Sequence, residues 1–447
     1  MGVERVHSRT WIRGGTVVTC CPNDDVVQGD VLVEGTRIKR VGPRLAPDGF
    51  TRVIDASGCA VIPGFVQAHV HLCQALLRGM ADDMPLLEWL RRRVWPLEAA
   101  HDPESLAASA DLGLYEMTCA GTTTILDMGT VNHHDAVMES CARSGVRAVS
   151  GKAMMDAGEG VPRALRETTK RSLDESDRLR KAWHGSSGGR ILYAYAPRFI
   201  LSCTEALLRE VAARSTDHEV LMHSHAAEHP GERAAVRERL GAEDVAILRR
   251  YGFKGPRAVL AHCVQLTDRE AREIAADGTR VVHCPSANLK LGSGIARVHE
   301  LLARGVHVGL GADGAPCNNN MDPWVELRHA ALLAKTRSGT EALPARRALR
   351  LATIEGARVL GLGDVTGSIE VGKRADLAVV RIDGAHTEPG GDVFSRLVYA
   401  CQARDVEHVF VDGEHIVRRG AHQRLDREAV LARARREAKA LARRAKL

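Results

Sequence analysis

Two pairs of histidines in this 447-residue chain have a spacing that suits metal binding. His69 and His71 end one apolar run, and His223 and His225 end another. Residues i and i+2 of a β-strand point to the same side, so each pair can offer two imidazoles to one site. Among 20 histidines, about one such pair is expected by chance, so the pairs need support from other residues.

Further polar residues end the apolar runs that follow. His262 ends one run, His283 ends the next, and Asp313 comes directly after the last. In an α/β barrel the carboxyl ends of the strands converge on one face, so these side chains would meet. Imidazoles and a carboxylate are suitable ligands for Zn²⁺ or Fe²⁺. The pattern therefore predicts one divalent metal ion, with zinc preferred and iron as the alternative.

Glu228 stands three residues beyond His225, just past the predicted strand end. A carboxylate there can take a proton from a metal-bound water without being a ligand itself. A lone glutamate at the start of a loop is more often solvated or a helix cap. The neighbouring histidines favour the catalytic interpretation.

Alternating strands and helices in residues 61–366 must position these groups. The pattern predicts a (β/α)₈ TIM barrel. An open doubly wound sheet is the alternative, but no G-x-G-x-x-G follows the first strand. The eight candidate strands are Val61–Val70, Thr123–Met128, Arg147–Met154, Arg190–Ala196, Glu219–His225, Arg257–His262, Thr279–Cys284 and Gly305–Gly311.

Short β segments flank the barrel region on both sides. We expect residues 1–60 and 367–447 to hold these segments, with a basic helix at the C-terminal end. Residues 426–447 carry eight Lys or Arg against three Asp or Glu, which is five of the six net positive charges. The simplest interpretation of this charge is an exposed, alanine-rich helix. No recognition motif accompanies the charge, so no nucleic-acid binding is expected.

Composition excludes several classes of protein. Hydrophobic residues are 45% and charged residues 26%, which is ordinary for a globular enzyme and not for a disordered chain. No run of about 18 apolar residues appears, so no membrane contact is expected. The 11 cysteines show no disulfide or C-x-x-C framework, which favours reduced thiols and a cytoplasmic location.

Taken together, these motifs resemble the amidohydrolase superfamily, in particular its aminohydrolase branch. The resemblance covers almost the whole chain and is carried by residues 61–71, 225–228, 261–263, 283–291, 313–314 and 372–377. It implies that the flanking β segments form one small β-sandwich domain built from both termini. It also implies that His69, His71, His225 and Asp313 bind the metal. Catalytic roles would fall to Glu228 as proton shuttle, to His262 at the attacked centre, and to Asp313.

Two branches of that family are mixed in this sequence. Residues 76–98, 288–296 and 313–319 are similar to the deaminases of methylthioadenosine, S-adenosylhomocysteine and 5′-deoxyadenosine, which implies that Glu98 holds ribose hydroxyls. Other segments, 71–74, 151–156 and 196–203, look like guanine deaminase. They imply substrate contacts by Gln74, Lys152 and Arg198.

The resemblance implies hydrolytic release of ammonia from an aminopurine. We expect a 5′-modified adenosine as the substrate, and guanine, a pterin or an s-triazine as the alternatives. A non-catalytic scaffold is disfavoured because every expected metal and proton-shuttle group is present. A homo-oligomer is expected from the family and from the general frequency of such assemblies.

Overall fold

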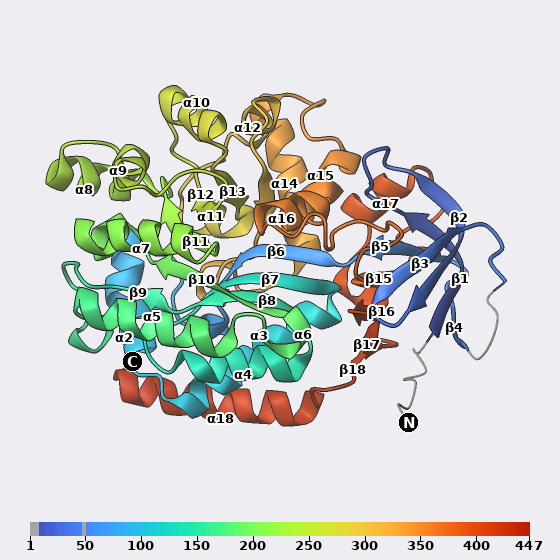
Figure 1. The fold of residues 1–447 in the computed structure, drawn as a ribbon, viewed down its shortest axis with the longest axis horizontal. Helices are drawn as coiled ribbons and strands as arrows, with labels where there is room; N and C mark the ends of the chain where they lie inside the picture. The colour runs from blue at the N-terminus through green and yellow to red at the C-terminus, as the bar shows by residue number, and fades with distance from the viewer. Residues whose placement is uncertain (1–8, 47–50) are drawn as a thin grey trace.

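Eight parallel strands form a closed barrel at the centre of the molecule (Figure 1). The computed structural model describes residues 9–46 and 51–447. The barrel closes because the last strand pairs with the first and the fourth pairs with the fifth. In order, the strands are β6 (Phe65–Val70), β7 (Thr122–Met128), β8 (Arg147–Gly151), β10 (Ile191–Pro197), β11 (Leu221–Ala226), β12 (Ala258–His262), β13 (Arg280–His283) and β14 (Val308–Leu310).

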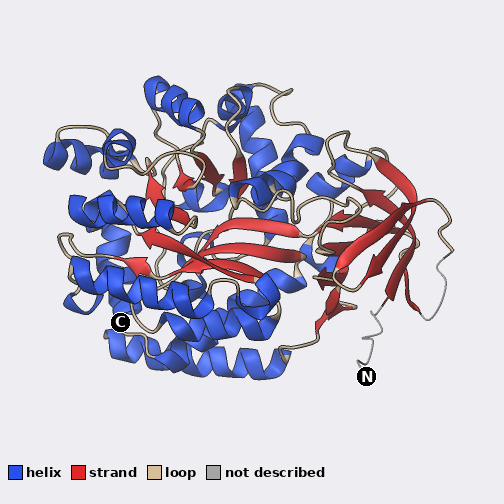
Figure 2. Cartoon of the chain, viewed as in Figure 1, coloured by secondary structure: helices blue, strands red, loops and turns tan. Residues whose placement is uncertain are grey.

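Most of these strands are buried along their whole length. Continuous burial is typical of parallel strands with both faces covered, and it explains their unbroken apolar runs. Helices surround the barrel (Figure 2), and the predicted (β/α)₈ fold is confirmed. The helices after the first insertion are α3 (Pro103–Cys119), α4 (His134–Ser144), α5 (Thr169–Trp183), α6 (Ser186–Gly189), α7 (Glu205–Asp217), α8 (Pro230–Leu240), α9 (Asp244–Arg250), α10 (Asp268–Asp277), α11 (Pro285–Lys290), α12 (Val298–Ala303), α13 (Ala315–Asn318), α14 (Pro323–Ser338), α15 (Ala345–Leu351), α16 (Ile354–Val359) and α17 (Val393–Tyr399).

Strands from both ends of the chain form a second, mostly antiparallel sheet beside the barrel. Its two halves join where β5 pairs with β15. Ile12 and Val33 from the first half share one core with Leu377 and Phe410 from the second. The domain expected from both termini is therefore confirmed. Its strands are β1 (Arg9–Val18), β2 (Val26–Glu34), β3 (Arg37–Gly42), β4 (Thr51–Asp55), β5 (Cys59–Pro63), β15 (Leu377–Arg381), β16 (Val406–Val411), β17 (Glu414–Arg418) and β18 (Ala421–His422).

The run Val61–Val70, expected as one strand, is divided between the two sheets. It breaks at Gly64, whose N–H donates to the carbonyl of Asp376. A Cβ at this position would lie 2.1 Å from the side chain of Thr123. Only glycine lets the backbone pass this close, so the chain turns here from β5 into β6.

The C-terminal helix α18 (Arg427–Ala445) lies along α3 (Figure 1). It is more buried than expected, because Ala434 and Leu441 pack into an apolar cluster with Leu76 and Leu97. No helix within residues 9–46 and 51–447 is long and apolar enough to cross a membrane.

The first insertion covers the carboxyl end of the barrel. It comprises a 3₁₀ turn η1 (Leu72–Leu77), a short helix α1 (Leu86–Trp89), a π-helical turn η2 (Leu90–Val94) and α2 (Trp95–Ala99). Asp102 then caps α3 by accepting the N–H of Ser105. π-Turns inside helices are rare and occur mostly at functional sites.

Candidate metal and catalytic centre

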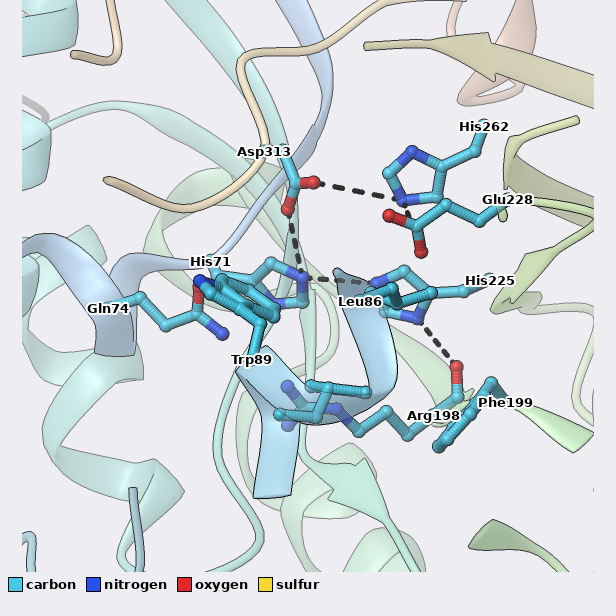
Figure 3. Close-up of a pocket in the computed structure, with 11 residues that line it drawn as sticks. His71, Gln74, Leu86, Trp89, Arg198, Phe199, His225, Glu228, His262 and Asp313 are labelled. Carbon is cyan, nitrogen blue, oxygen red and sulfur yellow. Dashed lines mark hydrogen bonds and ion pairs between the residues drawn. The ribbon is translucent and has the colours of Figure 1, made fainter. Parts of the chain in front are cut away.

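Four side chains meet at the carboxyl end of the barrel in a geometry that can hold one metal ion. His69 and His71 come from the end of β6, His225 from β11, and Asp313 from the loop after β14. Their ligand atoms all lie within 4.8 Å of one another. The Asp313 carboxylate is 3.4 Å from Nε2 of His69. It is 3.3 Å from Nε2 of His71 (Figure 3).

Backbone carbonyls fix the rings of two of these histidines. Nδ1 of His71 lies 2.7 Å from the carbonyl of Met128, and Nδ1 of His225 lies 2.6 Å from that of Arg198. A carbonyl only accepts, so both Nδ1 atoms carry the proton and both Nε2 atoms present lone pairs. These two Nε2 atoms are only 3.1 Å apart. Two lone pairs at this distance repel each other unless a cation lies between them.

Burial supports the same conclusion. Burial and the neighbouring His69 lower the pKa of His71 to about 3, so its ring stays neutral and able to ligate. Nε2 of His69 is buried and has no hydrogen-bond partner within the described chain. An orphaned buried nitrogen beside a carboxylate and two facing lone pairs fits a divalent metal ion.

Of the two histidines on β11, the structure brings His225 and not His223 into the cluster. Nε2 of His223 lies 2.9 Å from Nδ1 of His69 and fixes the orientation of that ring. His283, at the end of β13, is buried but lies outside the four-residue cluster.

Glu228 and His262 face the cluster from the other side (Figure 3). Nε2 of His262 lies 3.5 Å from the Glu228 carboxylate and 3.7 Å from that of Asp313. Burial, together with the charge of Asp313, raises the pKa of Glu228 well above its usual range. Burial alone would raise the pKa of Asp313, but His69, His262 and His71 together hold it well below its usual range. The two carboxyl groups therefore favour different protonation states.

The backbone at this centre adopts left-handed conformations. His262 has φ 72° and Asp313 has φ 63°. Such angles are uncommon for residues other than glycine and cluster at functional sites. Nδ1 of His262 is held 2.9 Å from the side-chain oxygen of Asn288. Asn288 belongs to the motif 283–291, but the sequence does not predict its contact with His262.

A small cavity lies directly over the cluster. It is about 20 Å³, room for about one water. Besides the polar groups, apolar side chains line it: Leu86, Trp89, Leu90 and Phe199. Sequence reasoning did not single these out, although it placed the first insertion at the mouth of the site.

Three of the four predicted substrate-binding residues meet beside the cavity. Gln74 Nε2 donates to Glu98 at 2.7 Å, and Arg198 Nη1 donates to the other oxygen of Glu98 at 2.6 Å. Gln74 and Arg198 line the cavity, whereas Glu98 does not. The fourth residue, Lys152, is buried elsewhere: its Nζ lies 2.5 Å from Glu167, and it does not line the cavity.

Comparison with known proteins agrees with this geometry. The sequence pattern of the amidohydrolase family matches residues 60–416, and the chain belongs to that family. It is 39% identical over 409 residues to a 5-methylthioadenosine/S-adenosylhomocysteine deaminase of Moorella thermoacetica, covering 91% of this chain and 93% of the relative. It is 38% identical to a 5′-deoxyadenosine deaminase of Methanothermobacter thermautotrophicus, covering 90% and 92%.

A solved structure is similar over nearly the whole chain. It is an adenosine deaminase from Xanthomonas campestris with bound zinc. The TM-score is 0.92 at 32% identity, covering 98% of this chain and 99% of the other. Both the barrel and the terminal sheet are thus shared with a zinc-bound deaminase.

Proposed function

We propose that this protein is a metal-dependent aminohydrolase that deaminates a 5′-modified adenosine. The products are the inosine analogue and ammonia. The observation that carries the proposal is the buried cluster of His69, His71, His225 and Asp313 with Glu228 and His262 facing it. Relatives at 38–39% identity, named as deaminases of such nucleosides, support the substrate class.

The metal ion is proposed to be zinc. Three imidazoles and one carboxylate suit zinc, and the similar adenosine deaminase holds it. Iron(II) accepts the same donors and is the alternative. When bound, such an ion lowers the pKa of water towards 7 and so supplies a hydroxide nucleophile at neutral pH.

The chain's own groups are proposed to move the protons. The ionised Asp313 accepts the proton of the attacking water. Glu228, whose pKa is raised by burial and by the charge of Asp313, donates a proton to the ring nitrogen next to the attacked carbon. His262, held by Asn288, lies where it can contact the oxygen that adds to the ring. Asp313 passes the proton taken from water to the amino group, which leaves as ammonia. The hydroxyl proton of the added oxygen returns to Glu228 as the ring carbonyl forms. Proton transfers of this kind contribute about 10²–10⁴-fold in rate.

Guanine or another aminated heterocycle is the second candidate. The observation that favours it is that Gln74 and Arg198, the guanine deaminase-like residues, line the cavity. The test is ammonia release by protein of known metal content. The panel is 5′-deoxyadenosine, methylthioadenosine, S-adenosylhomocysteine, adenosine, adenine and guanine. The main proposal predicts preference for the 5′-modified nucleosides, and a preference for guanine contradicts it.

The remaining expectations concern assembly and location. The eleven cysteines are all free thiols. Free thiols suit a reducing compartment, so we also propose that the enzyme works in the cytoplasm. A homo-oligomer is proposed on general frequency alone, and light scattering of the purified protein tests it.

A further inference from the structure

One buried carboxylate, that of Glu98, connects Gln74 and Arg198. Both of these side chains line the cavity, and neither belongs to the metal cluster. Gln74 donates to one oxygen of Glu98 and Arg198 to the other, at 2.7 and 2.6 Å. The side chains of Glu98 and Arg198 are 1% and 4% exposed. These three residues come from α2, η1 and the end of β10, so one carboxylate joins the first insertion to the barrel.

The contact with Glu98 fixes which way the amide of Gln74 points. A carboxylate only accepts, so the amide nitrogen must face Glu98. The amide oxygen is then left buried and without a hydrogen-bond partner in the described chain. It lies against Gly314, where a Cβ would be 1.8 Å away. Gln74 therefore holds one fixed, unsatisfied acceptor at the cavity wall.

The same contact fixes the guanidinium of Arg198. This group carries five N–H donors in a rigid plane, and one of them is used by Glu98. No other side-chain hydrogen bond of Arg198 occurs within residues 9–46 and 51–447. The backbone carbonyl of Arg198 also accepts from Nδ1 of His225, so the same residue orients one member of the four-residue metal cluster.

We propose that Glu98 is a specificity-determining positioning residue that acts on the substrate's ring through Gln74 and Arg198. Both of its oxygens are already engaged, and it does not line the cavity. To hold ribose hydroxyls directly, it would have to give up a charge-assisted bond with Arg198 that is buried from water. The inference rests on the proposed function only in requiring a purine-type ring as substrate.

The test compares matched substrates that differ only by the ribose. The pairs are adenine with 5′-deoxyadenosine, and guanine with guanosine. The proteins are wild type, Glu98→Ala, Glu98→Gln, Arg198→Ala and the double variant Glu98→Ala/Arg198→Ala. Glu88→Ala is the matched control, because Glu88 lies on the same insertion but pairs with Arg92 at the surface. Metal content and melting temperature are measured for each, and Glu98→Gln keeps the volume if Glu98→Ala folds poorly.

A positioning role predicts a loss of about tenfold or more in kcat/KM for Glu98→Ala, mostly through KM and nearly equal for base and nucleoside. In the Arg198→Ala background, Glu98→Ala should cost clearly less than in the wild type, because only its effect through Gln74 is left. If a base inhibits the enzyme without reacting, the change in its inhibition constant Ki is compared with the change in KM of the nucleoside. A loss confined to nucleosides, additive losses, or bases that neither react nor inhibit would overturn the proposal. Failure of the proposed function gives a different result: the wild type would act on guanine and guanosine instead of the adenine pair. The same comparison of base with nucleoside is then made on the guanine pair.

Discussion

The protonation states of two neighbouring carboxyl groups decide what chemistry the site supports. The neighbouring His69, His262 and His71 lower the pKa of Asp313 and favour its ionised form, whereas burial and the charge of Asp313 raise the pKa of Glu228 and favour its protonated form. Environments that push two pKa values apart assign one group as base and the other as acid. This difference arises from contacts between strands β6, β11, β12 and β14, so no local sequence motif contains it.

At the residue scale, Glu228→Gln should keep the metal and lose turnover. The amide has the same shape as the carboxyl group but cannot donate an acidic proton, and Glu228 is not part of the four-residue cluster. We expect kcat to fall by about 10²–10⁴-fold with metal content unchanged. Steady-state kinetics and elemental analysis on the same preparation measure both quantities. Wild-type turnover, or loss of the metal, would contradict the proposed role.

At the scale of elements, the sequence predicts the barrel strands better than it predicts the side-chain contacts between distant segments. The strand ends that carry His69, His225 and Asp313 were predictable because strand periodicity and barrel geometry are regular. The contacts of Trp89 and Asn288 were not, because they join segments far apart in the chain. The break at Gly64 was missed for the same reason: it depends on the close approach to Thr123.

The first insertion must move for a nucleoside to enter. The cavity over the metal cluster is about 20 Å³, far smaller than the volume of about 300–1,000 Å³ that ligand pockets have. Leu86, Trp89 and Leu90 cover it, and the π-turn η2 begins at the last of these. π-Turns occur mostly at functional sites, which agrees with the position of η2 over the cavity.

This motion predicts a fluorescence signal from Trp89. Binding of a product nucleoside should shift the tryptophan emission of the wild type, because the indole leaves a buried position that is 4% exposed. Trp89→Phe should lose most of the shift while keeping an apolar cover. The chain has five tryptophans, so the variant is the control that assigns the signal. An equal shift in Trp89→Phe would place the motion elsewhere.

At the scale of the molecule, a buried ion pair fixes the barrel against the terminal sheet. Arg147, at the start of β8, donates to Asp376 at 2.8 Å and to Asp412 at 2.5 Å. Its side chain is 3% exposed, and removing one partner of such a buried network generally costs about 3–5 kcal/mol. The two sheets therefore support each other, and the terminal domain helps to hold the frame on which the metal cluster is built.

Acid should destabilise the whole molecule through buried neutral histidines such as His134. Its Nε2 donates to Ser150, whose hydroxyl donates in turn to Asp127. Its Nδ1 has no partner in the described chain, and burial lowers the pKa of His134 to about 3. The unfolded chain takes up a proton near pH 6.5, but the folded chain does not. Stability is thus fully present above about pH 6.5 and falls as the pH drops towards 3.

Replacing this histidine should remove its share of the pH dependence. Between pH 6 and pH 5, the free energy of unfolding should fall by about 1 kcal/mol less in His134→Gln than in the wild type. Denaturant titrations at both pH values measure the difference, with metal content held equal. His133→Gln, at the exposed neighbour, should follow the wild type because that ring meets water in both states. If His134→Gln keeps the full wild-type pH dependence, the ring does not stay neutral in the folded protein, and the acid sensitivity must come from other groups.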